Sequence, residues 1–545
     1  MEVVSVVLVL LFAVVASGAI ARMLPVNIPT PLVQIAFGSV IGLAANLRVT
    51  LVPELFLLVF LPPLLFIDGW RIPKDELLKD VPVVVELALG LVLTTVIGVG
   101  FFIDWLIPAM PLAVSFALAA VVSPTDPIAV SAIAARVPIP RRMMHILEGE
   151  ALLNDASGLV CLRFAIAAAL TGSFSLAAAA ASFVWLAIGG IAIGVAVTLA
   201  VTRAKAWVSR RFGEDTGSQV LVSLLIPFAA YILAEHLHCS GILAVVAAGV
   251  TMTFAELSRQ ALPATRMRRN SVWDTIQFAL NGIIFVLLGE QLPVILAGAR
   301  ETVKLTNHDN PWWLALYVLA ITAVLAGLRF VWVWLSFRLT VLRHGQPGTA
   351  MRSTDWRVFA AMSLAGVRGV ITLAGVLTLP LALTDGTAFP ARDLAIALAA
   401  GVIIVSLVAA SIGLPLVLRG LSMPPEPSKR AEEDRARVLA AQAAIRAVES
   451  AEHRLAEGRN DADVYAEAAA RIMDLYRERI RVREDGESAP DDLQQNERID
   501  RSLRLAAVRA EREEVFRLLR QRTIGSETGR KLTRELDLLE GRLRT

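Results

Sequence analysis

Thirteen apolar stretches, each long enough to cross a lipid bilayer, occupy most of the first 420 residues and constrain the fold more than any other feature. A spanning helix needs about 20 mainly apolar residues, within a range of roughly 17–25. The sequence therefore predicts an all-α polytopic membrane protein with about 13 transmembrane helices. The stretches cover residues 3–21, 30–47, 51–68, 81–105, 111–135, 146–171, 176–201, 217–237, 240–257, 273–298, 312–337, 357–384 and 393–418.

Charged residues are concentrated after the last stretch. Residues 423–545 hold 25 of the 52 Lys and Arg residues and 26 of the 49 Asp and Glu residues. This distribution excludes a single soluble domain and a fully disordered chain. It predicts a transmembrane domain over residues 1–422 and a charged helical cytoplasmic tail over residues 423–545. Because the net charge is only +3 and the basic residues are dispersed, nucleic-acid binding has no support.

The tail shows apolar residues at helical spacing, which predicts two or three amphipathic helices with a break from Gly486 to Asp492. It contains no glycine-rich phosphate loop, so we expect a regulatory or oligomerising role and no enzymatic activity. Cys161 and Cys239 lie in or beside apolar segments and have neither metal-ligand nor disulfide-framework spacing. The sequence therefore indicates no cofactor.

Basic residues in the connecting segments predict the orientation in the membrane. Lys and Arg are several times more numerous in loops after odd-numbered stretches than in loops after even-numbered ones. Because basic loops stay in the cytoplasm, we expect the N-terminus outside and the tail inside. An odd number of spans also permits an inverted repeat, in which the fifth stretch corresponds to the twelfth. Both of these stretches carry helix-breaking residues near their middle.

The fifth stretch contains Ser123-Pro124-Thr125-Asp126-Pro127. Each proline removes a backbone donor and clashes with the preceding helical turn, so the helix is expected to unwind here. The freed carbonyls, the Thr125 hydroxyl and the Asp126 carboxylate are the oxygen ligands that a hard monovalent cation prefers. The alternative is a structural kink in which Asp126 caps the following half-helix, and the two roles are compatible.

The sixth stretch brings three polar side chains into an apolar helix. Glu150 and Asn154 are four residues apart and share one helix face, with Asp155 beside them. An ionisable group near the bilayer centre costs about 2.5–3.5 kcal/mol on insertion scales, so such groups are seldom incidental. A carboxylate that holds either a proton or a cation, but not both, is the minimum requirement for exchange. The alternative is a hydrogen-bonded cluster that only packs helices together.

Arg329 and Arg368 also lie within apolar stretches, so each is expected to have an acidic partner. The glycines beside Arg368 allow local unwinding of the twelfth stretch. Both arginines could instead form structural ion pairs that hold the bundle together, and Asp68 could lie at the cytosolic interface. The sequence leaves the partner of Arg163 open. The candidate acids for the two buried arginines are Glu150, Asp68 and Glu290.

Three motifs taken together resemble a known family: residues 123–127, residues 148–155 and Gly366-Val367-Arg368-Gly369. They are similar to motifs of the monovalent cation:proton antiporter family, and more narrowly of the NhaP-type bacterial sodium/proton exchangers, which are related to animal sodium/hydrogen exchangers. The resemblance covers roughly residues 1–420. It implies a homodimer in the bacterial plasma membrane, with 13 helices per subunit, a core that moves as an elevator, and two broken helices that cross.

The resemblance also implies roles for single residues. Asp155 would be the carboxylate that binds proton and cation, and Asn154 occupies the position that is a second aspartate in electrogenic relatives. The pattern therefore implies electroneutral exchange. Glu150 would pair with Arg329, and Thr125 and Asp126 would complete the cation site. Related exchangers often carry serine directly after the residue that matches Glu150, whereas this chain has Ala151, which leaves the choice among sodium, lithium and potassium open.

The expected mechanism follows from the cost of a buried charge. An ionised Asp155 is penalised in a dry barrier, whereas a protonated or cation-loaded Asp155 is not, so the carrier crosses only when it is loaded. We expect a sodium/proton antiporter that serves pH and sodium homeostasis. The alternatives are a potassium/proton antiporter of the same fold, a cation channel with a sensory tail, and a non-transporting membrane scaffold.

Overall fold

The computed structural model divides the chain into two units, Met1–Leu421 and Ser422–Thr545. In its described part the chain is helical and contains no β-strand, apart from one isolated bridge between Ala382 and Ala388. The structure describes residues 2–24, 28–44, 53–71, 90–126, 130, 141–171, 176–256, 263–304, 306, 310–344, 356–383, 386–419, 427–457, 462–484, 491–521, 523–524 and 526–544.

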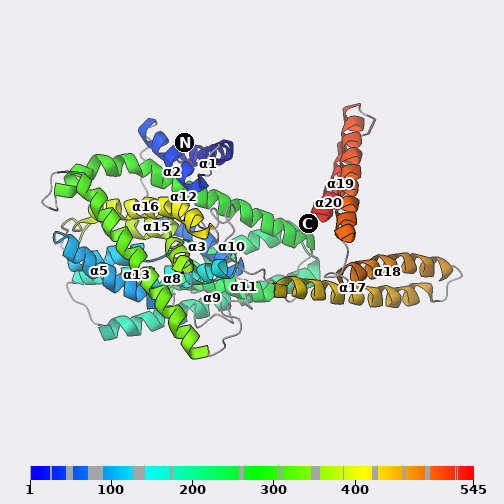
Figure 1. Ribbon diagram of the computed structural model, residues 1–545, viewed down its shortest axis with the longest axis horizontal. Helices are drawn as coiled ribbons and strands as arrows, with labels where there is room; N and C mark the ends of the chain where they lie inside the picture. The colour runs from blue at the N-terminus through cyan, green and yellow to red at the C-terminus, as the bar shows by residue number, and fades with distance from the viewer. Residues whose placement is uncertain are drawn as a thin grey trace. The chain divides into compact units, whose positions relative to one another are not determined.

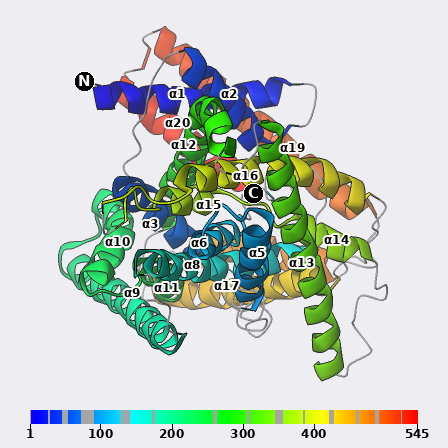
Figure 2. The same ribbon diagram turned by 90° about the vertical axis from the view of Figure 1, so that its left-hand side faces the viewer.

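Each predicted apolar stretch overlaps at least one helix of the first unit (Figures 1 and 2). Seven helices of the described residues are long and apolar enough to cross a membrane alone, and four shorter apolar helices accompany them. The fourth and fifth stretches extend into residues 72–89 and 131–140, which lie outside the described residues, so the number of 13 spans stays a prediction. The helices are α1 Glu2–Met23, α2 Thr30–Ala44, α3 Pro53–Arg71, α5 Val92–Leu106, α6 Leu112–Val122, α8 Arg141–Thr171, α9 Leu176–Phe212, α10 Thr216–His236, α11 Gly241–Glu256, α12 Pro263–Lys304, α13 Trp312–His344, α14 Trp356–Leu364, α15 Val370–Leu377 and α16 Arg392–Leu418.

Packing separates the helices of this unit into two groups. One group contains α1, α2, α3 and α9 to α12, and the other contains α5, α6, α8 and α13 to α16, with fewer contacts between the groups than within them. Every predicted site residue except Asp68, which lies on α3, is on a helix of the second group or on a non-helical segment next to one. The site therefore belongs to one of two packed bodies.

Glycines allow the helices of the first group to approach closely. A Cβ atom at Gly38 of α2 would overlap the backbone of α12 at Val286, and one at Gly289 of α12 would overlap α2 at Ile35. A Cβ atom at Gly194 of α9 would likewise overlap the backbone of α11. Lipid tails are as apolar as leucine, so close packing of small residues is what holds such helices together.

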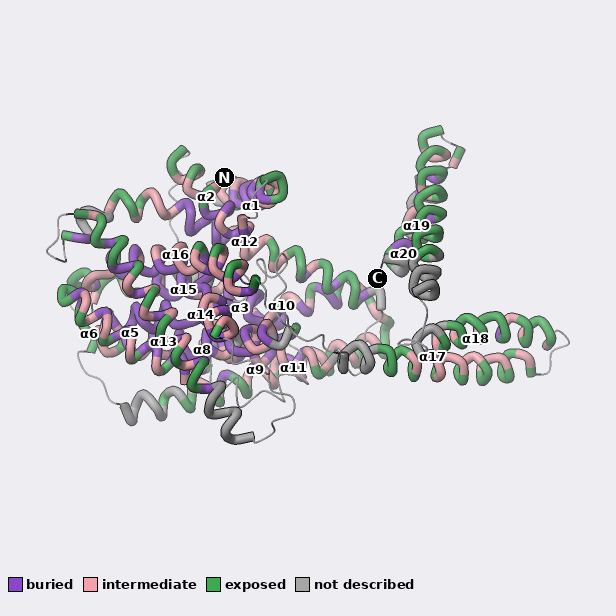
Figure 3. Tube along the Cα trace, in the orientation of Figure 1, coloured by how far each residue is buried: buried purple, intermediate pink, exposed green. Residues whose placement is uncertain are grey.

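The described residues of the second unit, taken by itself, form four helices, more than the two or three predicted from its sequence. They are α17 Pro427–Ala456, α18 Ala462–Glu484, α19 Asp491–Arg520 and α20 Ser526–Arg544. Most of their surface is exposed, whereas buried residues concentrate inside the membrane unit (Figure 3). Asp491 and Asp492, the last two residues of the predicted break, already belong to α19, and the rest of the break lies outside the described residues.

Helix α17 packs against α18, and α19 packs against α20. The second pair closes on a small core of Val508, Val515 and Leu536. Beside this core, Arg512 pairs with Asp537 at 2.9 Å and also with Glu540. The extra helix was not predicted because short polar connections without proline separate α17 from α18 and α19 from α20.

Candidate functional site

Two non-helical segments of the second packed group meet, one directly after α6 and one between α14 and α15, and their meeting point is called the crossing below. Helix α6 ends at Val122, and residues 123–126 continue without helical structure. Residues 365–369 likewise separate α14 from α15. At the crossing, the Asp126 backbone N–H donates to the Val367 carbonyl at 2.7 Å. A Cβ atom at Gly369 would overlap the Asp126 carboxylate, so the approach of the two broken segments requires glycine at this position.

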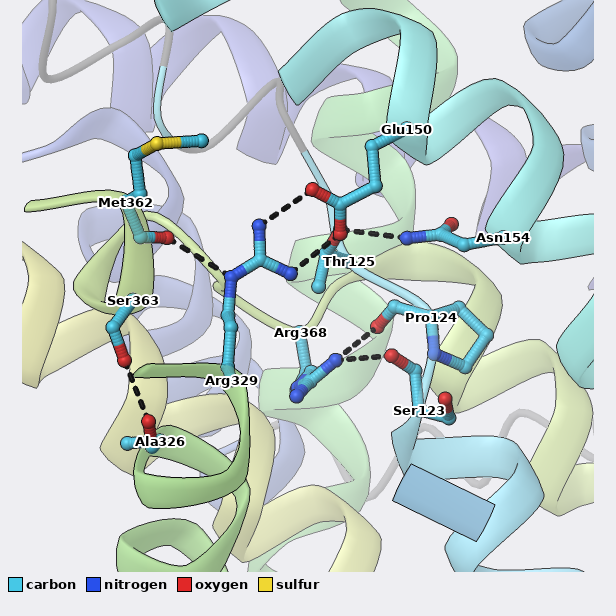
Figure 4. Close-up of polar contacts among 10 residues, drawn as sticks. All are labelled: Ser123, Pro124, Thr125, Glu150, Asn154, Ala326, Arg329, Met362, Ser363 and Arg368. Atoms are coloured by element: carbon cyan, nitrogen blue, oxygen red, sulfur yellow. Dashed lines mark hydrogen bonds and ion pairs between the residues drawn. The ribbon is translucent and has the colours of Figure 1, made fainter. Parts of the chain in front are cut away.

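Arg368, two residues before α15, forms hydrogen bonds across the crossing. Its Nη1 donates to the carbonyl oxygens of Ser123 and Pro124, the latter at 3.0 Å (Figure 4). Its backbone N–H donates to Ser406 Oγ at 3.1 Å. These carbonyls belong to the segment where the helix is broken, so they lack the usual helical partners and must find a donor in protein or water. The guanidinium supplies that donor.

The expectation that Arg368 pairs with an acid therefore differs from the structure. Within the described residues its side chain bonds to carbonyl oxygens, because the broken helix exposes enough partial negative charge to hold a buried cation. Asp68, predicted as an ion-pair partner, is partly buried and forms no ion pair in the described part of the chain. Glu290 is buried and accepts a hydrogen bond from Gln291 Nε2 at 2.6 Å.

Glu150 and Arg329 form a buried, two-pronged ion pair. Arg329 Nη1 and Nη2 donate to Glu150 Oε1 and Oε2 at 2.5 and 2.7 Å, and the two residues are 2% and 0% exposed. Arg329 Nε also donates to the Met362 carbonyl at 2.9 Å. Two parallel charge-assisted hydrogen bonds hold the two side chains in one relative orientation and also add binding energy. This is the pair that the family resemblance implies, and it ties α8 to α13 and α14.

Thr125 joins the broken segment to α8. Its hydroxyl accepts from Asn154 Nδ2 at 2.8 Å and donates to Glu150 Oε1 at 3.4 Å (Figure 4). A Cβ atom at Gly158 would lie 2.5 Å from Pro124 Cγ, so the absence of a side chain lets α8 lie against the break. Asn154 is 1% exposed, and its Oδ1 has no hydrogen-bond partner among the described residues.

Asp155 lies on α8 directly after Asn154 and is 7% exposed. It forms neither a hydrogen bond nor an ion pair with any residue that the structure describes. Since Glu150 is neutralised by Arg329, the charge of Asp155 is uncompensated by a cationic side chain in this part of the chain. Three other carboxylates lie within its electrostatic range: Asp126, Asp68 and Glu150.

The arrangement suits a small monovalent cation or a proton. Hydroxyl, amide and carboxylate oxygens are hard ligands, which favour alkali cations over softer metals. The predicted residues Thr125, Asp126, Asn154 and Asp155 are all buried near the crossing, whereas Asp68 contributes from α3 at longer range. The site therefore combines oxygen ligands with a carboxylate whose charge a bound proton or cation can remove.

Sequence reasoning missed several partners. The carbonyls of Ser123, Pro124 and Met362 carry no residue-type signal, because any residue has a carbonyl. Ser406 could have been noticed as a lone hydroxyl in the last apolar stretch. Arg163 pairs with Glu235 of α10 at 2.8 Å, and both side chains are partly exposed.

Comparisons with known proteins agree with this arrangement. The sequence profile of the transmembrane sodium/hydrogen exchangers matches residues 7–420. A protein of Escherichia coli strain K12, named as the uncharacterized Na(+)/H(+) exchanger YjcE, is 42% identical over 548 residues, covering 100% of this chain and 99% of that protein. A sodium, potassium, lithium and rubidium/H(+) antiporter of Bacillus subtilis strain 168 is 42% identical over 427 residues, covering 76% of this chain and 62% of that protein.

A solved structure is also similar. The sodium proton antiporter MjNhaP1 from Methanocaldococcus jannaschii at pH 8 aligns with a TM-score of 0.57 and 18% sequence identity. The alignment covers 77% of this chain and 99% of that chain. At this level of identity the likeness establishes a shared fold, with all-helical architecture.

Proposed function

The chain belongs to the sodium/hydrogen exchanger family, and we propose that it is an electroneutral sodium/proton antiporter that works by alternating access. The observation that carries the proposal is the state of Asp155. Its carboxylate is buried beside Asn154 and the Thr125 segment, and no cationic side chain of the described residues pairs with it. A proton or a cation can compensate its charge, and each excludes the other.

Charge balance at the crossing supports one-for-one exchange. The Glu150 charge is already neutralised by Arg329 at 2.5 Å. Asn154 beside Asp155 is a neutral amide, so this position adds no second titrating carboxylate. A single group that exchanges one proton for one monovalent cation moves no net charge across the membrane.

Coupling follows from the penalty on an uncompensated charge. An ionised Asp155 passing a dry barrier would be disfavoured by several kcal/mol, at least about 2.5 on insertion scales. Loading with a proton or a cation removes most of that penalty. The carrier then reorients only when it is loaded, which makes it an exchanger and prevents a leak. In this scheme Thr125, Asp126 and Asn154 supply further oxygen ligands.

A potassium/proton antiporter is the second candidate. Ala151, the residue after Glu150, is 4% exposed and brings no hydroxyl to α8, so the site has fewer fixed oxygens for a small cation. The name of the Bacillus subtilis relative includes sodium, potassium, lithium and rubidium. Both observations favour broad selectivity among monovalent cations.

We further propose that the protein is a homodimer in the lipid of the bacterial plasma membrane, with its N-terminus outside and its tail in the cytoplasm. The excess of Lys and Arg in loops after odd-numbered apolar stretches supports this orientation. The proposed role of the second unit, Ser422–Thr545, is regulation of transport and not catalysis. A chain truncated after Arg419 that still transports would exclude the scaffold alternative.

The test uses energised everted membrane vesicles with a proton-sensitive dye. Sodium, potassium and lithium are added separately, with and without a clamp on the membrane potential. Dye recovery with sodium that is unchanged by the clamp supports electroneutral sodium/proton exchange. Recovery with potassium alone selects the second candidate, and the absence of recovery with every cation between about pH 6 and 9 contradicts both.

A further inference from the structure

Thr372 is the third residue of α15, directly after the break at the crossing. It is 1% exposed, and its Oγ1 has no hydrogen-bond partner among the described residues. Buried side-chain hydroxyls are almost always hydrogen-bonded, so an unpartnered one calls for an explanation.

Other threonines of the membrane unit show what Thr372 lacks. A threonine inside a helix usually donates to the carbonyl four residues earlier. Thr322 of α13 does so to Val318 at 2.7 Å. The residue four positions before Thr372 is Arg368, which lies in the non-helical break, so its carbonyl is not presented as a helical acceptor. The same back-bond is made by Thr94, Thr171, Thr202 and Thr251.

Two glycines define the surroundings of Thr372. Gly369 and Gly375 lie three residues before and after it, so all three share one side of the short helix. A Cβ atom at Gly369 would overlap the Asp126 carboxylate. A Cβ atom at Gly375 would lie 3.3 Å from Val121 Cγ2 and 3.4 Å from Leu159 Cδ2.

This side of α15 therefore packs against the two elements that carry the acidic residues of the site. Val121 is in the last turn of α6, just before the broken segment that carries Asp126. Leu159 is one helical turn after Asp155 on α8 and shares its face. Thr372 consequently lies between a glycine that contacts the Asp126 carboxylate and a glycine that contacts the Asp155 face of α8.

We propose that Thr372 Oγ1 is an oxygen ligand of the transported monovalent cation and helps to determine which cation is preferred. This inference rests on the proposed antiport function. A hydroxyl offers lone pairs to a hard cation, as does Asn154 Oδ1, another buried oxygen without a hydrogen-bond partner among the described residues. The cation is then held between α8 and α15, whereas a proton needs the Asp155 carboxylate alone.

The two ligands of the exchanger should therefore respond differently to loss of this hydroxyl. Cation binding loses one charge-assisted contact, which corresponds to a rise of about tenfold in the cation KM. Proton binding loses nothing, so protons compete better and the exchange profile moves to higher pH. The smaller cations, sodium and lithium, should be affected more than potassium, because they depend more on closely placed oxygens.

The test compares Thr372→Val, which removes the hydroxyl at nearly constant volume, with Thr372→Ser, which keeps it. KM and maximal rate are measured for sodium, lithium and potassium in everted vesicles across pH. We expect Thr372→Val to raise the sodium KM about tenfold, with a smaller change in maximal rate, and Thr372→Ser to keep a KM close to native. The matched control is Thr322→Val, whose hydroxyl only back-bonds within α13.

Folding is checked by thermal melting of each purified variant, and Thr372→Ala gives a second way to remove the hydroxyl. Because the Thr372 hydroxyl has no hydrogen-bond partner among the described residues, Thr372→Val should melt no lower than the native protein. A native sodium KM in both Thr372→Val and Thr372→Ala would overturn the inference while leaving the antiport function standing. A defect in Thr372→Ser equal to that of Thr372→Val would also overturn it. Absence of exchange by the native protein would overturn the proposed function itself.

Discussion

Removing one partner of the Glu150–Arg329 pair should destabilise the protein strongly. In Glu150→Ala, Nη1 and Nη2 of Arg329 lose acceptors at 2.5 and 2.7 Å, and only the bond from Nε to the Met362 carbonyl remains. Arg329 is 2% exposed, so its charge is shielded from bulk water. A buried charge left without its partner costs about 3–5 kcal/mol.

The double variant Glu150→Leu with Arg329→Leu distinguishes two quantities: the free-energy cost of leaving one buried charge unpaired, and the net contribution of the ion pair to stability. Replacing both partners by apolar residues removes the buried charge altogether, so most of the lost stability should return. Unfolding of the purified protein in mixed detergent gives the free energy of each variant. A loss below about 1 kcal/mol in Glu150→Ala, or a double variant as unstable as the two single changes added together, would refute this reasoning.

Three further predictions follow from other contacts. Gly369→Ala should abolish exchange, because its Cβ overlaps the Asp126 carboxylate, whereas Gly327→Ala on α13, with no atom within 4 Å of the added carbon, should exchange normally in the vesicle assay. Arg163→Gln breaks a half-exposed pair with Glu235 and should cost less than about 1 kcal/mol of unfolding free energy, so a loss as large as that of Glu150→Ala would contradict it. Asp215 caps the N-terminus of α10, and hydrogen bonds from the side chain and backbone of Ser218 lower the pKa of its carboxyl group. The ionised Asp215 cap should therefore stabilise the protein above about pH 4, and this stabilisation should disappear as the pH falls through the lowered pKa. The melting temperatures of the native protein and Asp215→Asn should accordingly differ in their pH dependence only in acid, and identical profiles would count against the assignment.

The helical architecture was predictable because apolar length is a direct physical requirement of the bilayer. The positions of the helix ends were harder to predict. Helix α12 begins at Pro263, ten residues before the predicted stretch, because its charged first turns carry no apolar signal. Arg269 there is 2% exposed and lies 5.0 Å from the ring centroid of Trp70. No local sequence pattern predicts such a contact with a distant helix.

The site was predictable to a similar extent. Pro124 and the glycines beside Arg368 mark both breaks, since these residues act on the backbone itself. The partners of Arg368 were not predictable, because they are carbonyl oxygens that become acceptors only once the helix is broken. The unpartnered hydroxyl of Thr372 was missed for the same reason, since its sequence context is that of an ordinary helical threonine.

The central claim is that protons and cations compete for one buried carboxylate, Asp155. The most direct measurement is the number of protons released when sodium is added to the purified protein in weakly buffered detergent solution, compared with Asp155→Asn. The account predicts one proton released for each cation bound by the native protein, and neither release nor binding in a variant that still melts as a folded protein. Undiminished proton release in folded Asp155→Asn, or sodium binding by the native protein without proton release, would contradict it.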